Sequence, residues 1–203
     1  MFGVNADRAV RYAELLATTG VERGLIGPGE APRIWRRHLF NSAAVTRLIP
    51  QGAQVLDLGS GAGLPGIPVV LVRPDLQMTL LEPMARRVEF LRECLVELDL
   101  PEVTVDHNRA QDGPLLAADR VLARAVKPLP ALVELAWPLT APGGALLAIK
   151  GAKAAAEAAQ LSARSDRSAA VHTLTDAMGD PATVVEVRWT SLPPTRKSDR
   201  KAS

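Results

Sequence analysis

Residues 55–68 decide the fold of this chain, because they combine a strand, a sharp turn and the start of a helix. They read Val55-Leu56-Asp57-Leu58-Gly59-Ser60-Gly61-Ala62-Gly63-Leu64-Pro65-Gly66-Ile67-Pro68. The first four residues are apolar except for Asp57, which is typical of a strand buried in a sheet. The alternate glycines that follow allow the backbone to turn sharply and to lie against a ligand. An apolar helix is expected next, over residues 67–73, and its N-terminus would suit an anionic group.

On the C-terminal side of this segment, the hydrophobic pattern alternates between strand and helix. Strands are expected over residues 78–81, 103–107, 120–123, 145–149, 170–174 and 183–189, and helices over residues 86–98, 129–137 and 152–164. Strands that alternate with helices predict βαβ units and a largely parallel sheet. Right-handed crossovers then place helices on both faces of the sheet. The sequence therefore predicts the α/β class.

The N-terminal side has a different pattern and predicts a short helical cap over residues 1–50. Helices are expected over residues 5–18 and 33–48, with a Gly- and Pro-rich loop over residues 24–32 between them. The apolar stripe of the first helix is read as Val10, Ala13, Leu16 and Ala17. We expect the core to span residues 51–192, and residues 193–203 to form a basic, loose tail.

Composition limits the classes of protein to which the chain can belong. It has 203 residues, of which 47% are hydrophobic and 23% charged, enough for one sizeable core and unlike a disordered chain. A single cysteine, Cys94, excludes an intrachain disulfide and favours a reducing compartment. We find no secretory signal and no apolar stretch that would span a membrane, so a cytoplasmic location without a membrane partner is expected. The net charge is only +2, but 19 of the 24 basic residues are arginine, which permits a polyanionic partner without requiring one.

The glycine-rich turn has two competing interpretations. Residues 61–66 match the G-x-G-x-x-G pattern of a dinucleotide site, and Glu82 follows at a spacing that suits a ribose. Alternatively, Asp57 ends the strand two residues before the first turn glycine, Gly59, as in sites for S-adenosylmethionine, where that acid faces the methionyl end. Pro65 stands where a dinucleotide fingerprint needs a regular helical turn, so we favour the methyl donor. A tight turn without any ligand is disfavoured by the three glycines and the two strand-end acids.

Polar residues follow the predicted strands at their carboxyl ends, where parallel sheets bind ligands. They are Asp57, Glu82, residues 108–111, Arg124 and Lys150. This coincidence predicts an active site at that edge of the sheet.

These segments together resemble the glucose-inhibited division protein B family, the ribosomal small subunit methyltransferases G. Besides residues 55–68, the resemblance rests on Arg37-His38-Leu39 with Ser42, Leu80-Leu81-Glu82, Arg86-Arg87-Val88-Glu89-Phe90-Leu91, Asn108-Arg109-Ala110, Arg124-Ala125 and Leu147-Ala148-Ile149-Lys150-Gly151. It covers residues 30–190. It implies a Rossmann-like, seven-stranded methyltransferase fold with a reversed last strand. It also implies methylation of N7 of one guanosine in 16S ribosomal RNA, with S-adenosyl-L-methionine as the cofactor and the RNA or the small subunit as the partner.

The resemblance also implies roles for individual residues. The donor would be bound by Asp57, Gly59, Gly61 and Leu64 of the turn, by Glu82 at the ribose, by Ala110 and Gln111 at the adenine, and by Arg124. With this core, the basic run Arg33, Arg36, Arg37 and His38 is expected to contact RNA, and Lys150 is either a phosphate contact or a plain surface lysine. Gln111 and Asn41 stand where the family often has acids, and residues 20–32 replace its usual Asn-Leu-Thr segment.

The expected chemistry needs few side chains. Guanine N7 has an exposed lone pair, so no base or covalent nucleophile is predicted, and the enzyme has only to align the reactants and exclude water. Cys94 lies within a helix among leucines and is expected to be a buried hydrophobe. No cluster of His and Cys suggests a metal site. The alternatives are a methyltransferase for a small molecule or a protein, and a non-catalytic assembly factor that binds S-adenosylmethionine.

Overall fold

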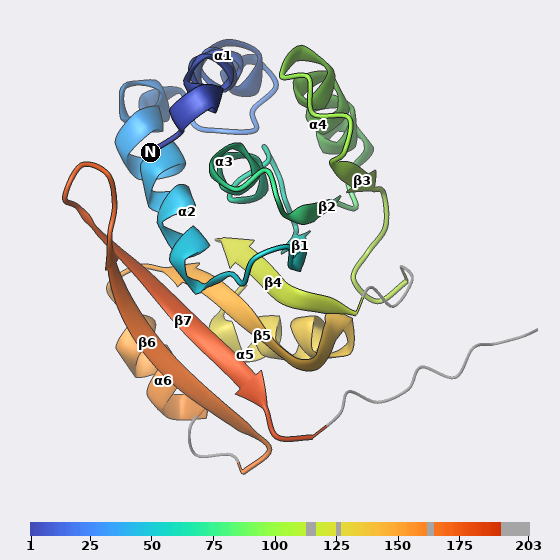
Figure 1. Ribbon diagram of the computed structural model, residues 1–203, viewed down its shortest axis with the longest axis vertical. Helices are drawn as coiled ribbons and strands as arrows, with labels where there is room; N and C mark the ends of the chain where they lie inside the picture. Colours follow the sequence, from blue (N-terminus) through green and yellow to red (C-terminus); the bar gives the residue numbers. More distant parts are fainter. Residues whose placement is uncertain (113–116, 125–126, 162–164, 192–203) are drawn as a thin grey trace, which may run out of the picture.

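The computed structural model describes residues 1–112, 117–124, 127–161 and 165–191, which form a seven-stranded sheet with helices on both faces (Figure 1). The strands are β1 (Gln54–Leu58), β2 (Gln77–Leu81), β3 (Thr104–Asp106), β4 (Ala118–Arg124), β5 (Thr140–Lys150), β6 (Arg167–Thr175) and β7 (Pro181–Trp189). Their spatial order is β3-β2-β1-β4-β5-β7-β6, and β7 runs antiparallel to both of its neighbours. The predicted α/β class and the reversed last strand are confirmed.

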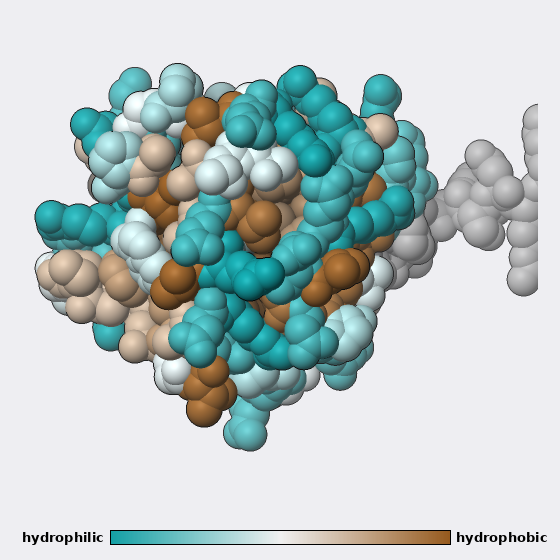
Figure 2. Space-filling model, turned by 90° about the horizontal axis from the view of Figure 1, so that it is seen from above, coloured by the Kyte–Doolittle hydropathy of each residue, from teal (hydrophilic) through white to brown (hydrophobic). Residues whose placement is uncertain are grey.

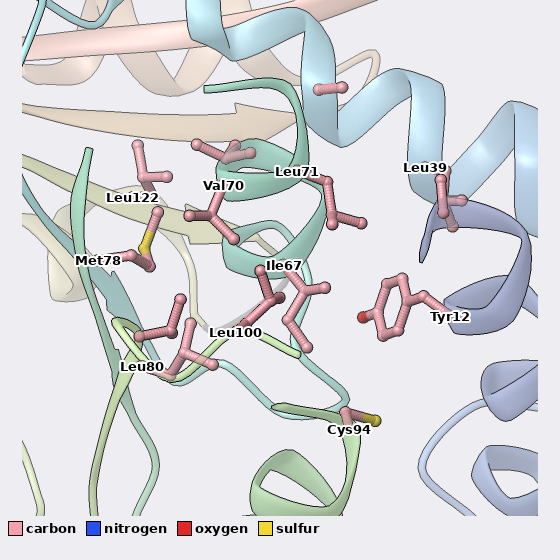
Figure 3. Close-up of a cluster of buried hydrophobic side chains, with 14 of the residues drawn as sticks. Tyr12, Leu39, Ile67, Val70, Leu71, Met78, Leu80, Cys94, Leu100 and Leu122 are labelled. Carbon is pink, nitrogen blue, oxygen red and sulfur yellow. The ribbon is translucent and has the colours of Figure 1, made fainter. Parts of the chain in front are cut away.

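Helices cover the two faces of the sheet through two separate hydrophobic clusters. One cluster joins α3 (Gly66–Val72) and α4 (Ala85–Glu97) to the N-terminal helices, and Figure 3 shows its centre. The other joins α5 (Leu129–Ala136) and α6 (Ala154–Leu161) to the opposite face. A short 3₁₀ turn, η6 (Trp137–Leu139), leads from α5 into β5. The predicted helices on both faces are therefore confirmed.

Strand β1 lies inside the sheet, and side chains along it alternate between the two clusters. Val55 packs into the α3 cluster, whereas Leu56 and Leu58 pack into the α5 cluster. Since successive side chains of a strand point to opposite faces, Asp57 points to the same face as Val55. This alternation directs the buried Asp57 carboxylate toward the beginning of α3.

The N-terminal residues form a chain of short helical segments that share a core with α3. The segments are η1 (Gly3–Asn5), α1 (Ala6–Leu15), η2 (Leu16–Gly20), η3 (Pro28–Arg33), η4 (Ile34–Phe40), α2 (Asn41–Ala43) and η5 (Ala44–Leu48). Tyr12, Leu16 and Leu39 are fully buried and belong to the same cluster as Ile67 and Leu71 of α3 (Figure 3). We call residues 1–48 the cap. The boundary that we placed at residue 50 stays a prediction.

The stripe predicted for the first helix is partly wrong. Ala9, Tyr12, Ala13 and Leu16 are buried, whereas Val10 and Ala17 are exposed. The buried stripe is thus rotated toward Tyr12, because its ring fills the space beside α3. Seen from the end of the molecule where α1 and α4 lie, hydrophilic residues cover most of the surface and hydrophobic ones show as separate patches (Figure 2).

Two element boundaries also differ from the expectation. Residues 28–33 form a 3₁₀ helix, although residues 24–32 were expected to be a loop and residue 33 to begin the next helix. Strand β5 begins at Thr140, which pairs with Ala118, although Pro142, Gly143 and Gly144 read locally as a turn. The predicted tail, residues 193–203, lies outside the described residues. None of the helices in the described ranges is long and apolar enough to cross a membrane.

We predict that Gly66→Ala destabilises the fold, because the first turn of α3 has no room for a methyl group. A Cβ at this position would overlap Leu80 Cδ2 and would lie 2.7 Å from Asp57 Oδ2. Such overpacking costs about 1–3 kcal/mol of unfolding free energy, which urea denaturation measures. Gly151→Ala is the matched control, because a Cβ there meets no atom within 4 Å. Equal stability of the two variants would contradict this account of the turn.

Candidate functional site

The candidate site is a cavity of about 560 Å³ between the glycine-rich turn and the cap, at the carboxyl ends of β1, β2 and β4. The turn contributes residues 59–62 and Leu64, the segment after β2 contributes residues 82–84, and the first turn of α4 contributes Arg87. Strand β4 contributes Arg124, and the cap contributes residues 25–27, Glu30 and His38. A volume of this size suits a cofactor or drug-sized ligand. The site therefore lies at the edge of the sheet where the sequence predicts it.

A second hollow, of about 410 Å³, lies at the opposite edge, where Gln54 and Gln77 begin β1 and β2. Ligands of open α/β sheets bind outside the carboxyl ends of the strands. The hollow at the amino ends is therefore not the candidate site.

Glu82 holds the turn in place while facing the cavity. Its side chain is almost fully buried; Oε2 accepts a hydrogen bond from Gly61 N–H at 2.9 Å, and Oε1 accepts one from Met84 N–H at 3.0 Å. Arg87 Nη1 lies 3.7 Å from Oε2, beyond hydrogen-bond distance. A carboxylate has about four acceptor positions, so two remain for a ligand. The turn itself needs glycine, since φ is +73° at Gly59 and +58° at Gly61. This arrangement leaves acceptor positions of Glu82 toward the cavity, and the contact of Glu82 with a ribose stays a prediction.

Asp57 lies behind the turn and does not line the cavity. Its carboxylate is fully buried, and Oδ2 accepts a hydrogen bond from Gly66 N–H at 2.9 Å. Burial raises the pKa of Asp57 to about 7. Oδ1 has no hydrogen-bond partner among the described residues. The side chain thus acts on the site by closing the turn onto α3, and its contact with the methionyl end stays a prediction.

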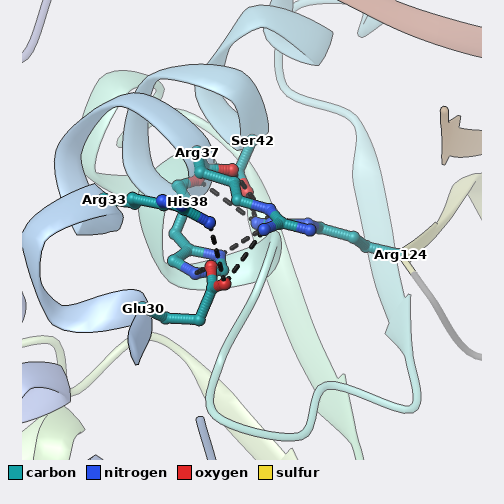
Figure 4. Close-up of polar contacts among 6 residues, drawn as sticks. All are labelled: Glu30, Arg33, Arg37, His38, Ser42 and Arg124. Carbon is teal, nitrogen blue, oxygen red and sulfur yellow. Dashed lines mark hydrogen bonds and ion pairs between the residues drawn. The ribbon is translucent and has the colours of Figure 1, made fainter. Parts of the chain in front are cut away.

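Arg124 joins the end of β4 to the cap (Figure 4). Nη1 donates to Ser42 Oγ at 3.0 Å and to the His38 carbonyl at 3.4 Å, and Nη2 donates to the Arg37 carbonyl at 2.9 Å and to His38 Nδ1 at 2.7 Å. The guanidinium lines the cavity, but these contacts use the donors of both terminal nitrogens. The resemblance implies that Arg124 binds the donor, which stays a prediction, and the structure adds a positioning role for Arg124 that sequence reasoning missed.

The contact with Arg124 determines the tautomer of His38. A guanidinium only donates, so Nδ1 must be unprotonated, and Nε2–H then donates to Glu30 Oε2 at 2.9 Å. Burial and the nearby Arg124 lower the pKa of His38. Glu30 also pairs with Arg37 at 2.9 Å. No local motif marks Glu30, because its partners come together only through the packing of the cap.

Tyr12 connects the cap to the turn. Its buried hydroxyl donates to the Ala62 carbonyl at 2.7 Å. The apolar spacing in α1 is the signal that could have placed this side chain in the core, but not its hydrogen-bond partner. The cap and the turn are therefore held at a fixed separation across the cavity.

The residues expected to contact RNA are all paired with carboxylates. Arg36 makes two parallel hydrogen bonds of 2.8 Å to Asp180, in the turn between β6 and β7. Arg37 and Arg33 lie 2.9 Å and 3.9 Å from Glu30, and Lys150 lies 2.9 Å from Glu157. The three arginine side chains are 58–65% exposed, so they can reach a partner, but each is already in an ion pair.

The two residues expected at the adenine end lie beyond β3. Ala110 is half-buried and Gln111 is exposed, and neither lines the cavity. Their contact with the donor stays a prediction. Cys94 is buried, and burial raises the pKa of its thiol to about 12, which confirms it as a core residue.

The strand order, the glycine turn after β1 and the acid at the end of β2 give this chain the fold of the S-adenosylmethionine-dependent methyltransferases. A SAM-dependent methyltransferase from Aquifex aeolicus superposes with a TM-score of 0.56 at 19% identity, covering 73% of this chain and 89% of that one. The precorrin-6y C5,15-methyltransferase of Geobacter metallireducens gives 0.56 at 16% identity, covering 74% and 86%.

Sequence comparison shows to which family of methyltransferases the chain belongs. Residues 5–184 match the family of rRNA small subunit methyltransferase G, and the chain belongs to this family. The enzyme of that name from Thermobifida fusca is 57% identical over 77% of this chain and 67% of its own length. The Salinispora tropica enzyme is 47% identical over 100% of this chain and 90% of its own length. The match to the Kineococcus radiotolerans enzyme, at 56% identity, spans 63% of that enzyme.

We predict that acid weakens the attachment of the cap through His38. Because the folded state lowers the pKa of His38 below 6.5, it favours the neutral ring. The stabilisation that the neutral ring contributes is fully present above pH 6.5 and is lost as the pH falls from 6.5 through the lower pKa of the folded state. The difference in unfolding free energy between wild type and His38→Gln should shrink from about pH 8 to about pH 5. His107→Gln is the control, since His107 makes one exposed contact of 3.3 Å with the Pro83 carbonyl. A difference that does not change with pH would contradict the tautomer assignment.

Proposed function

We propose that this protein transfers the methyl group of S-adenosyl-L-methionine to N7 of one guanosine in the 16S ribosomal RNA of the small subunit. The observation that carries the proposal is the family match over residues 5–184, which includes both walls of the cavity. The N7 position rests on the family's activity. The partner is the RNA or the small subunit, and the cytoplasm is the expected location.

The residues of the cavity fit a methyl donor. Glu82 has free acceptor positions for ribose hydroxyls, and Leu64 and Met84 offer apolar surface beside it. A Cβ at Gly61 would meet only the Gly59 carbonyl, at 3.9 Å, so the turn leaves open space for a ligand. When bound, the donor supplies a methyl group on a positively charged sulfur. The turn and Glu82 would hold that group in a fixed place.

The geometry also fits the small chemical demand of N7 methylation. The N7 lone pair forms the new C–N bond, and the electrons of the S–C bond remain on sulfur, so no proton moves. His38, the one histidine among the described lining residues, is held between Arg124 and Glu30 and is not placed to act as a base. The protein's contribution is therefore to align the reacting atoms and to exclude water.

The test uses small subunits from cells that lack this gene, incubated with purified protein and methyl-labelled S-adenosylmethionine. We expect label in 7-methylguanosine of the ribosomal RNA. Glu82→Gln should lower the rate at limiting donor by about 10- to 100-fold. One carboxylate oxygen becomes an amino group, which cannot accept a hydrogen bond from the ribose or from the turn. The control is Glu97→Gln, which removes the same charge from an exposed pair with Arg11.

Other outcomes of this experiment point to the alternatives. Label in another nucleoside would overturn the N7 assignment and keep the donor. No label, with donor binding shown separately, would favour a small-molecule or protein methyltransferase, or a non-catalytic assembly factor.

We expect RNA phosphates to compete with the carboxylates Asp180 and Glu30 for the arginines of the cap. A phosphate accepts two parallel hydrogen bonds from a guanidinium, as the Asp180 carboxylate does from Arg36. We predict that Asp180→Asn binds RNA several-fold more tightly at low salt, with a salt slope steeper by about 0.7–0.9 per phosphate gained. Binding is measured by titration over a range of salt concentrations.

The matched control is Asp99→Asn, which releases Arg8 of α1 from a 2.7 Å pair with the turn that follows α4. Both variants gain the same net charge. If Asp180→Asn binds no more tightly than Asp99→Asn, then Arg36 does not contact phosphate.

A further inference from the structure

Two carboxylates face the cavity from opposite walls. Glu82 comes from the sheet and Glu30 from the cap, and no other acid lines the cavity within the described part of the chain. Glu82 is used by the turn and suits the ribose. Glu30 is not among the residues that the resemblance assigns to the donor, so its place in the wall needs a separate explanation.

The surroundings of Glu30 fix its position and leave it able to accept further hydrogen bonds. Its side chain is 24% exposed; Oε2 lies 2.9 Å from His38 Nε2, and Oε1 lies 2.9 Å from Arg37 Nη1 and 3.9 Å from Arg33 Nη1 (Figure 4). These neighbours use no more than three of the four or so acceptor positions of a carboxylate. Leu25 and Ile26, from the same wall, give this end of the cavity an apolar border.

The shape of guanine connects this wall to the reaction. N7 lies on the imidazole side of the base, and the N1–H and N2 amino donors lie at the opposite end, on the Watson–Crick edge. When N7 faces a methyl group held by the turn, that edge points away from the turn, and the cap lines the cavity on the side that does not belong to the sheet. Enzymes that act on an extruded base read this edge with hydrogen bonds.

We propose that Glu30 is the residue that selects guanine, by accepting hydrogen bonds from N1–H and from the N2 amino group of the target base. The inference rests on the proposed function and adds the origin of its base specificity. Adenine presents an acceptor at N1 and has no N2 amino group, so it would leave the carboxylate unpaired in a partly desolvated site. His38 and Arg37 act as positioning residues that hold Glu30 toward the base.

The test compares guanosine with inosine at the methylated position of rebuilt small subunits. Inosine keeps N7 and N1–H but lacks the N2 amino group. For the wild type we expect kcat/KM to be about 10- to 100-fold lower on inosine, the effect of one hydrogen bond to a charged group. For Glu30→Gln we expect kcat/KM to fall by a similar factor on guanosine and by much less on inosine. The preference of the variant for guanosine over inosine should therefore be only a few-fold.

Two controls separate this role from a structural one. Glu97→Gln removes a carboxylate from a pair with Arg11 away from the cavity and should keep the full preference for guanosine. The affinity of Glu30→Gln for S-adenosylhomocysteine, followed by titration calorimetry, should equal that of the wild type. A variant that lost structure around the cavity would bind S-adenosylhomocysteine more weakly. It would also be slowed by the same factor on guanosine and on inosine.

The outcomes are distinct for the two proposals. If the wild type forms 7-methylguanosine but has the same kcat/KM on inosine as on guanosine, the proposed role of Glu30 is overturned and the proposed function stays intact. A Glu30→Gln variant that is equally slow on both bases also overturns it, because Glu30 then acts only through the cap. A wild type that forms no 7-methylguanosine overturns the proposed function itself, and with it the role of Glu30.

Discussion

The hydrogen bond from Gly66 N–H to the buried Asp57 carboxylate is the contact on which the rest of the structure depends. It closes the turn between β1 and α3 at 2.9 Å and fixes the direction in which α3 leaves the sheet. A buried carboxylate is costly to keep charged, which is why its pKa rises to about 7, and the helix N-terminus offsets part of that cost. Since α3 also forms the core that the cap packs against, this one junction places both walls of the cavity.

Polar contacts then set the distance between the walls. Tyr12 joins the cap to the turn through the Ala62 carbonyl, and Arg124 joins it to the end of β4 through four acceptors. Buried networks of this kind are stable when each donor is satisfied. Here the neutral His38 accepts a hydrogen bond from Arg124 and donates one to Glu30. The cap is therefore part of the site and more than a cover over the sheet.

The charge balance of the surface follows from these contacts. The chain has many arginines, but Glu30 and Asp180 offset two of the three positive charges of Arg33, Arg36 and Arg37, so this basic sequence segment is not a fully open basic patch. A polyanion that binds there would compete with these carboxylates, so its binding would depend on geometry as well as on charge.

The sequence by itself determined the class of fold, the glycine turn, the strand-end acid Glu82 and the burial of Cys94. These features are local, because hydrophobic periodicity and turn conformation depend on residues that are close together in the sequence. Only the tertiary structure decided the rotation of the α1 stripe toward Tyr12, the direction of Asp57 and the partners of the charged residues. Arg124 meets the cap 82–87 positions away, and Arg36 meets Asp180 144 positions away. No local pattern encodes such pairs, because the packing of helices against the sheet brings them together.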